Sequence, residues 1–275
     1  MLLVQEFLEN LKLVEKNSKR KEGAQIILLK RKLMNLNLVN CYFLKTGEIP
    51  LPPAHLIGFS HAYRPVNQLI KQTTLLIDLT KSEEQLLKDL HRTNRKQIRQ
   101  AAKYDFQIEV LDCPTLANIR EFQKFYNEFA KYTNTYKCGA FHVKTMELLM
   151  ESSNLIITRI VSKSSSEPLA YQVYITDEET ALSLYSASHF RLKDNAIDKR
   201  MLSIASRYLF WSNILYFKRR NNLVYDMGGL TTNDNISSFK MEFGGEITEV
   251  YSGYETTSLL GKLVLFGRTI KLRKG

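Results

Sequence analysis

The residues best suited to chemistry lie in one stretch, Tyr225–Tyr254, with the sequence YDMGGLTTNDNISSFKMEFGGEITEVYSGY. Its two glycine pairs allow sharp turns or a close approach of the backbone to a ligand. Asp226 ends a strand-like segment, where it could hold an amine or cap the glycine turn. Phe239 and Phe243 have i, i+4 spacing, so they can anchor one helical turn and leave Lys240 free to point elsewhere. Lys240 is then either a ligand-facing ammonium or a surface lysine beside two core rings.

This stretch resembles the C-terminal signature of the Fem family of peptidoglycan aminoacyltransferases, in which a strand ending in YDF or YDM and a glycine precedes an FKxxFGG turn. Other segments resemble family elements in the same order. They are the strand, acidic turn and basic helix of residues 73–111, the helix of residues 121–133 and the paired strands of residues 167–189. Together these segments cover roughly two-thirds of the chain, which is more specific than any one motif.

The resemblance implies acyl transfer to an amine, with Lys240 acting on the acyl donor or on the developing negative charge, and with Asp226 as the second predicted catalytic residue. It also places an acceptor cleft near the end of the last central strand. The predicted substrate-binding residues in these two regions are Tyr185, Ser188, His189, Tyr225 and Phe239. A tyrosine at such a position is often a packing residue, and a lone histidine is often a hydrogen-bonded structural residue.

Residues 80–104 are expected to form one long helix, because Thr80 and Glu83 fit a capping box and apolar residues recur at helical spacing. The cations of this segment fall largely on other faces; they are Arg92, Arg95, Lys96, Arg99 and Lys103. Each is either a solvated charge or a contact to a phosphate-bearing substrate. Arg95 and Arg99, one turn apart, are the pair we predict to bind substrate.

Strand-like segments at residues 155–162, 168–176 and 181–188, followed by a helix at residues 195–217, give the order that a GCN5-related acyltransferase (GNAT) fold requires. We therefore predict an α/β (α+β) fold, a GNAT-like mixed central sheet flanked by helices with a truncated N-terminal GNAT-like portion. The predicted domains are residues 1–75, too few for a complete first acyltransferase domain, and residues 76–275.

The loop before that last helix, HFRLKDNAIDKR, contains no glycine. In acyl-CoA acetyltransferases this loop carries R/Q-x-x-G-x-G/A, whose backbone amides hold the pyrophosphate at a helix N-terminus. Arg191 and Lys193 could still meet an anion through their side chains, and they are our predicted cofactor-binding residues. The Fem enzymes also lack the glycine loop, because their donor is aminoacyl-tRNA, so we predict no bound cofactor.

The composition limits the partners. The 39 Lys and Arg residues against 28 Asp and Glu give a net charge of +11, which favours phosphate-bearing partners such as tRNA, a nucleotide-linked sugar or anionic lipid. Surface charge without such a partner would give the same balance. The three cysteines are widely separated and have no metal-ligand spacing, so we expect free thiols and no metal. No apolar run approaches the roughly 20 residues that span a bilayer, and a cytoplasmic location is expected.

Residues 258–275 combine apolar and basic side chains without an acidic one. Such a segment could lie in an anionic membrane interface near a lipid-linked acceptor, or close the core and leave a solvated basic tail. We expect weak association with an anionic membrane surface that salt releases.

Three functions fit these patterns. The first is a Fem-like acyltransferase that moves an aminoacyl group from aminoacyl-tRNA to an amino acceptor such as a cell-wall precursor. The second is an N-acyltransferase that uses acyl-CoA or an acyl carrier and modifies an amino sugar or small amine. The third is a non-catalytic basic binding module.

Overall fold

The computed structural model describes residues 26–33, 35–45, 53–65, 69–133, 135–192, 195–256 and 258–273. By its contacts the chain divides into two compact units. The larger described unit is Leu76–Glu246, and the smaller combines Gln25–Leu75 with Ile247–Gly275. The C-terminal segment, which the sequence patterns grouped with residues 76–246, therefore packs with residues of the N-terminal part of the chain.

The larger unit is built on a mixed sheet. Its strands hydrogen-bond in the order β4 (Ile70–Asp78), β9 (Val224–Gly229), β8 (Thr180–Ser188), β7 (Pro168–Thr176), β6 (Leu155–Ser162) and β5 (Phe106–Leu111). Strands β5 to β8 are antiparallel to their neighbours, whereas β8 and β9 are parallel. The predicted mixed α/β fold is confirmed, and the three central strands lie within one residue of their predicted bounds.

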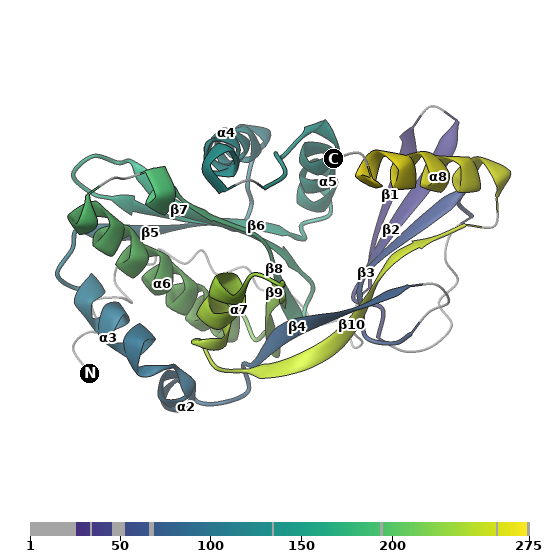
Figure 1. The fold of residues 1–275 in the computed structure, drawn as a ribbon. Helices are drawn as coiled ribbons and strands as arrows, with labels where there is room; N and C mark the ends of the chain where they lie inside the picture. The colour runs from purple at the N-terminus through teal and green to yellow at the C-terminus, as the bar shows by residue number, and fades with distance from the viewer. Residues whose placement is uncertain are drawn as a thin grey trace. The chain divides into compact units, whose positions relative to one another are not determined.

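Helices cover both faces of this sheet (Figure 1). On one face lie α4 (Leu116–Thr133) and α5 (Ala140–Glu151). On the other lies α6 (Ala196–Arg219), with α3 (Arg92–Ala101) packed beside it. The α6 face is closed by buried side chains of β6, β7 and α6, namely Ile160, Leu169, Ala170, Leu202, Ala205 and Leu209. A hydrophobic core therefore fixes α6, and with it whatever packs on α6, against the sheet.

The single helix expected over residues 80–104 is wrong, because the chain forms two helices, α2 (Glu83–Asp89) and α3 (Arg92–Ala101). The capping box belongs to Ser82 and Gln85, whereas Thr80 donates to Asp78. At the break, Leu90 adopts an extended backbone with its side chain buried, and His91 caps α3. The amide of His91 donates to the carbonyl of Glu242 at 2.8 Å, so a tertiary contact takes the place of a continued helix.

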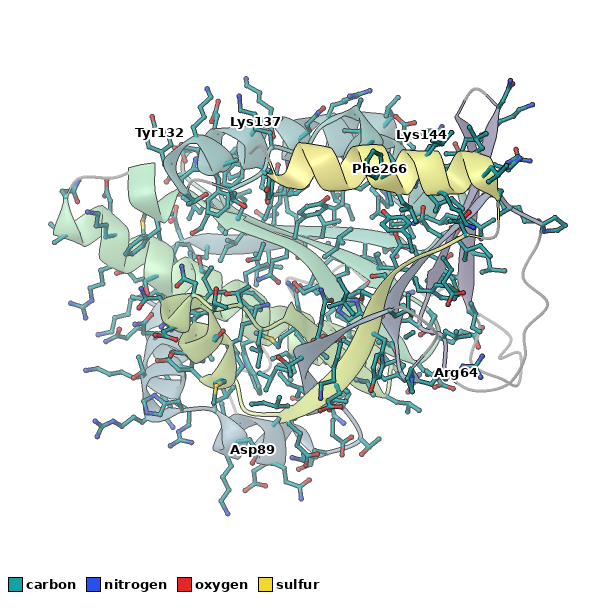
Figure 2. All side chains as sticks on the ribbon, turned by 45° about the vertical axis from the view of Figure 1, so that its right-hand side comes forward. Arg64, Asp89, Tyr132, Lys137, Lys144 and Phe266 are labelled. Carbon is teal, nitrogen blue, oxygen red and sulfur yellow. The ribbon has the colours of Figure 1, made fainter. Side chains whose placement is uncertain are left out.

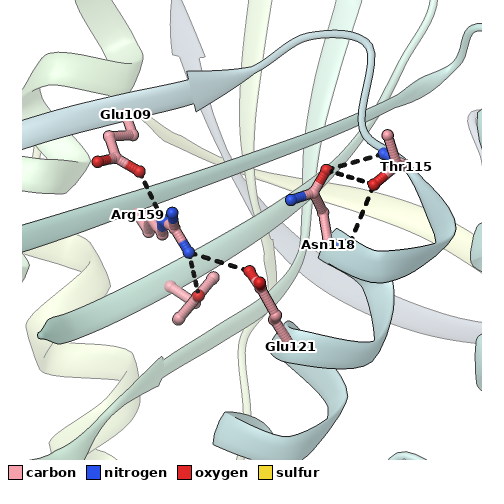
Figure 3. Close-up of polar contacts among 6 residues, drawn as sticks. Glu109, Thr115, Asn118, Glu121 and Arg159 are labelled. Atoms are coloured by element: carbon pink, nitrogen blue, oxygen red, sulfur yellow. Dashed lines mark hydrogen bonds and ion pairs between the residues drawn. The ribbon is translucent and has the colours of Figure 1, made fainter. Parts of the chain in front are cut away.

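A polar network fixes α4 on the sheet (Figure 3). Arg159 on β6 donates to Glu109 on β5 at 2.6 Å and to Glu121 on α4 at 3.1 Å. The same guanidinium donates to the hydroxyl of Tyr171 on β7 at 3.0 Å. Because one partly buried cation joins three elements, the aromatic face of α4 is held over the central strands.

The strands of the smaller unit hydrogen-bond in the order β1 (Ile27–Leu33), β2 (Leu36–Tyr42), β3 (Leu56–Ala62), β10 (Glu246–Glu255) and the first part of β4. Strands β1 and β2 form an antiparallel hairpin, β2 and β3 are parallel, and β3 and β10 are antiparallel. Cys41, Leu44, Phe59 and Ala62 form a buried cluster on this sheet.

The C-terminal helix α8 (Leu259–Arg273) belongs to the smaller unit and exposes apolar side chains. Leu259, Leu263 and Phe266 are 80%, 68% and 66% exposed, and their i, i+4, i+7 spacing puts them on one stripe. Figure 2 labels Phe266 on this helix. Gly261, on the other side of the helix, is buried against His55 and Thr256. In the part of the chain that the structure describes, no helix combines the length and apolarity needed to cross a bilayer.

Candidate functional site

The candidate site lies where the parallel strands β8 and β9 part. Their pairing covers Thr180 with Val224, Ala181 with Tyr225 and Leu182 with Asp226. Just beyond it, Gly228 has a φ of +77°, and a Cβ atom there would lie 2.8 Å from the carbonyl oxygen of Ser183. Only glycine fits this left-handed backbone and this close approach. The first glycine pair of the sequence motif therefore shapes the end of β9.

Lys240 reaches this strand end from α7 (Asp234–Met241). Its Nζ donates to the carbonyl oxygens of Gly228 at 3.0 Å and Gly229 at 2.8 Å. An ammonium has three protons, so two hold the lysine in place, and the third has no hydrogen-bond partner among the described residues. Burial lowers the pKa of Lys240, and the nearby carboxylate of Asp226 acts in the opposite direction. The site thus holds an oriented ammonium in partly dehydrated surroundings.

Asp226 is fully buried, and its Oδ1 accepts a hydrogen bond from the amide of Gly228 at 2.7 Å. This contact is the turn-capping role that the sequence left open beside a role in binding an amine. The carboxylate also favours the charged form of Lys240. Asp226 therefore shapes the turn and the electrostatics around Lys240.

Phe239 explains how α7 is positioned. Its ring packs on Phe210 of α6 and on Phe243, with centroids 5.5 Å and 5.4 Å away, and the guanidinium of Arg207 lies 4.9 Å from its centroid. Arg207 in turn donates to Glu242 at 3.0 Å. In this arrangement Phe239 anchors α7 to α6, so its neighbour Lys240 is held against β9.

Tyr185 and His189 lie in an aromatic cluster with α4 and α5. The ring of Tyr185 packs on Phe122 and Tyr126, with centroids 5.5 Å and 5.1 Å away. His189 stacks on Phe125 at 3.7 Å and lies 3.9 Å from Glu128. Ser188, partly exposed at the end of β8, pairs with Ala170. These residues line the α4 side of the sheet, whereas α7 packs on α6.

Tyr225 is fully buried beneath the site. Its hydroxyl lies 2.7 Å from that of Tyr174, which also donates to Gln172, and Asn213 of α6 joins this buried polar cluster. Burial raises the pKa of Tyr225, so the phenol stays neutral. A ring without exposure supports the strand and offers no surface to a ligand, so the proposed site does not include Tyr225.

The predicted anion-binding residues have different surroundings. Arg95 donates from Nη1 to the carbonyls of Lys88 and Leu90, each at 2.7 Å, and so closes the C-terminal end of α2. Arg99 is exposed on α3. Arg191 lies in a short 3-10 helix, His189–Leu192, but its side chain is not described. Lys193 lies outside the described residues. Within the described ranges, no group of three or more His, Cys, Asp and Glu side chains could hold a metal ion.

Solved structures provide the comparison with known proteins. A structure of FemX superposes with a TM-score of 0.56 at 12% identity, covering 86% of this chain and 86% of that chain. The fold is similar to that of FemX. The C-terminal domain (DUF2156) of a putative lysylphosphatidylglycerol synthetase from Agrobacterium fabrum gives a TM-score of 0.51 at 10% identity, covering 90% of this chain and 88% of that chain. No family model matches the sequence, and no curated protein does. The GNAT-like fold expected from the sequence is thus confirmed.

Two features of this region were missed from the sequence. Arg207 links Asn94 of α3, at 2.7 Å, to Glu242 after α7, and so joins three segments that are far apart in the chain. A hollow between α3 and α6 is lined by Arg92, Lys96 and Arg200. The only sequence signal for the hollow was the i, i+4 spacing of Arg92 and Lys96, which sequence reasoning had passed over in favour of Arg95 and Arg99.

Proposed function

We propose that the protein is an acyltransferase that forms an amide by moving an aminoacyl group from aminoacyl-tRNA to an amino acceptor of the cell envelope. The observation that carries the proposal is Lys240, held by two backbone carbonyls at the divergence of β8 and β9 with its third proton available. The motif around it resembles the Fem signature, and the fold is similar to that of FemX.

The reaction needs little from the protein beyond positioning and charge stabilisation. The donor carbonyl is an ester, which is already activated, so no nucleophilic side chain is required. The acceptor amine forms the C–N bond and the carbonyl oxygen becomes an oxyanion. The oxyanion then reforms the carbonyl as the ester C–O bond breaks, and the leaving ribose oxygen of the tRNA takes the proton that the amine loses and becomes a hydroxyl. The third N–H of Lys240 would donate to the oxyanion, where a fixed cation in partly dehydrated surroundings acts strongly.

The donor is tested by binding. A purified preparation should bind a mixed aminoacyl-tRNA pool in a salt-dependent manner, and should bind CoA or acetyl-CoA weakly, because no glycine lies between His189 and Arg200 to form a pyrophosphate loop. Electrophoretic shift with labelled tRNA and calorimetry with CoA are the two measurements. A micromolar dissociation constant for CoA would replace this proposal with acyl transfer from acyl-CoA.

The exposed stripe of α8 supports an acceptor presented at a membrane surface. Leu259, Leu263 and Phe266 could enter the interface, and the exposed Lys262 could meet anionic headgroups. We expect the protein to sediment with vesicles that contain anionic lipid, to be largely released at about 0.5 M salt, and to bind neutral vesicles poorly. Replacing Leu263 and Phe266 by Ser should weaken sedimentation. Unchanged sedimentation of that variant would exclude α8 as the contact.

A further inference from the structure

Helix α3 carries a row of exposed cations. Arg92, Lys96 and Arg99 have i, i+4, i+7 spacing and so share one side of the helix, and Lys103 follows in the turn after the helix ends at Ala101. All four are exposed, while Asn94 and Ala101 on the opposite side are buried. The helix therefore faces the core with small or amide side chains and faces solvent with charge. We call these four residues the α3 basic row.

The α3 basic row borders a hollow. An open depression of about 710 Å³ lies between α3 and the beginning of α6, lined by Arg92, Thr93, Lys96, Gln97, Gln100 and Arg200. Arg200 adds a cation from a second helix. The hydroxyl and amide side chains add neutral donors and acceptors of the kind that contact phosphate oxygens and sugar hydroxyls.

Among the described residues, these cations have no carboxylate partner. Helix α3 contains no acidic residue, and among the described residues no ion pair involves Arg92, Lys96, Arg99, Lys103 or Arg200. Other arginines of the same unit, such as Arg159 and Arg207, are paired. Arg92 also stands in the first turn of α3, where the helix dipole disfavours a cation. An anionic ligand would offset both the unfavourable interaction of Arg92 with the helix dipole and the repulsion between neighbouring cations.

We infer that the α3 basic row and Arg200 bind the sugar-phosphate backbone of an RNA strand. Identifying the ligand as RNA rests on the proposed function. The cations of α3 repeat along one side of the helix, over about 10 Å from Arg92 to Arg99 at roughly 1.5 Å per residue, as phosphates repeat along a strand. The row has no exposed apolar neighbour on α3, where Ile98 is partly buried, so it lacks what a membrane-inserting helix needs.

The test uses the full-length protein and an RNA hairpin that mimics a tRNA acceptor stem and carries no aminoacyl group. Binding is followed by fluorescence anisotropy at several salt concentrations. The triple variant Arg92→Ala, Lys96→Ala, Arg200→Ala should lose at least about tenfold in affinity near 0.1 M salt. The negative slope of log affinity against log salt concentration should become shallower by about 1 to 3, because each lost phosphate contact removes roughly 0.7 to 0.9 from its magnitude.

A matched control removes the same charge elsewhere. Lys124→Ala, Lys131→Ala and Lys137→Ala together take three exposed cations from α4 and the segment after it, on the other face of the sheet (Figures 1 and 2). This variant should bind the hairpin almost as the wild type does. Equal losses in both triple variants, or wild-type affinity and salt slope in the α3 variant, would overturn the inference. Binding of the α3 basic row to anionic vesicles without binding to the hairpin would also overturn it.

Transfer activity separates this inference from the proposed function. Lys240→Ala should bind the hairpin normally, because Lys240 is not part of the row. If the row binds RNA but no acceptor receives an aminoacyl group, the proposed function fails alone. If transfer from aminoacyl-tRNA occurs and the α3 variant binds RNA unchanged, the inference fails alone.

Discussion

Lys240→Ala should lower turnover by about 10²-fold or more, the scale on which the removal of an oxyanion-stabilising group acts. The substitution removes the ammonium that α7 extends to the end of β9, and it changes neither the ester of the donor nor the amine of the acceptor. Affinity for the tRNA donor should change little, so the loss should appear in the chemical step. Single-turnover transfer from a labelled aminoacyl-tRNA to an amine acceptor measures it.

A lysine that is free to point elsewhere, as the spacing of Phe239 and Phe243 predicts, could be removed with almost no loss of stability, but the structure gives Lys240 two backbone partners. Nζ of Lys240 donates to the carbonyls of Gly228 and Gly229, and both carbonyls lose a charged donor in the variant. We therefore expect a loss of about 1–3 kcal/mol in the free energy of unfolding. Thermal and urea unfolding must accompany the kinetics, and activity is compared at a temperature where both proteins are folded.

Two further variants accompany this test: Lys163→Ala is the control, and Asp226→Asn tests the charge beside Lys240. Lys163→Ala removes an exposed lysine after β6 and should leave turnover and stability unchanged. Asp226→Asn keeps an oxygen to accept from the amide of Gly228 but removes the charge that favours the ammonium of Lys240. The wild-type rate should fall at alkaline pH, at values below the ordinary lysine pKa of 10.5, and Asp226→Asn should move that fall to lower pH. Turnover of Lys240→Ala equal to wild type would end the assignment.

The central part of the fold could be predicted because its signals are local. Strands β6, β7 and β8 are short apolar runs separated by the turns KSSSE and DEE, and α6 follows with a helical apolar stripe. The break between α2 and α3 could not be predicted. Leu86, Leu90 and Ile98 continue one periodic pattern across it, no glycine or proline marks it, and the contact that replaces the helical hydrogen bond comes from Glu242.

The candidate site was predictable where the motif itself defines the geometry. Gly228, Asp226 and Lys240 meet because one strand, one loop and one short helix bring them together within 15 residues of sequence. Contacts between distant segments had no such signal. Arg95 looked like a substrate ligand from its charge and spacing, yet it caps α2, because the helix break places two carbonyls beside it. Charge alone cannot tell a capping arginine from a binding one.

Phe243→Ala should destabilise the protein by about 3–5 kcal/mol, the range for removing a buried phenylalanine ring. Phe243 is 2% exposed, and its ring lies 5.2 Å from Phe210 and 5.4 Å from Phe239. Removing it leaves a cavity between α6 and the end of α7. The second glycine pair follows at once; Gly244 has a φ of +76°, and a Cβ atom there would lie 3.0 Å from the carbonyl oxygen of Asp89. The surrounding chain therefore has little freedom to fill the cavity.

Phe239→Ala provides the comparison, because the two rings share Phe210 but differ in exposure. Phe239 is partly exposed, with the guanidinium of Arg207 over its face, so its loss should cost about 1–2 kcal/mol, less than the 3 kcal/mol expected for a core ring. For each kcal/mol lost from the free energy of unfolding, Phe239→Ala should lower turnover more than Phe243→Ala does, since Phe239 adjoins Lys240 and anchors it.

Urea unfolding of both single variants and the double variant measures these terms. Because the rings touch, the double variant should lose less than the sum of the two single losses. A loss for Phe239→Ala equal to or greater than that for Phe243→Ala would mean that α7 is held mainly through Phe239. In that case the wild-type position of Lys240 would depend on the Arg207 and Phe210 contacts alone, and Arg207→Ala should then reduce turnover as strongly as Phe239→Ala does.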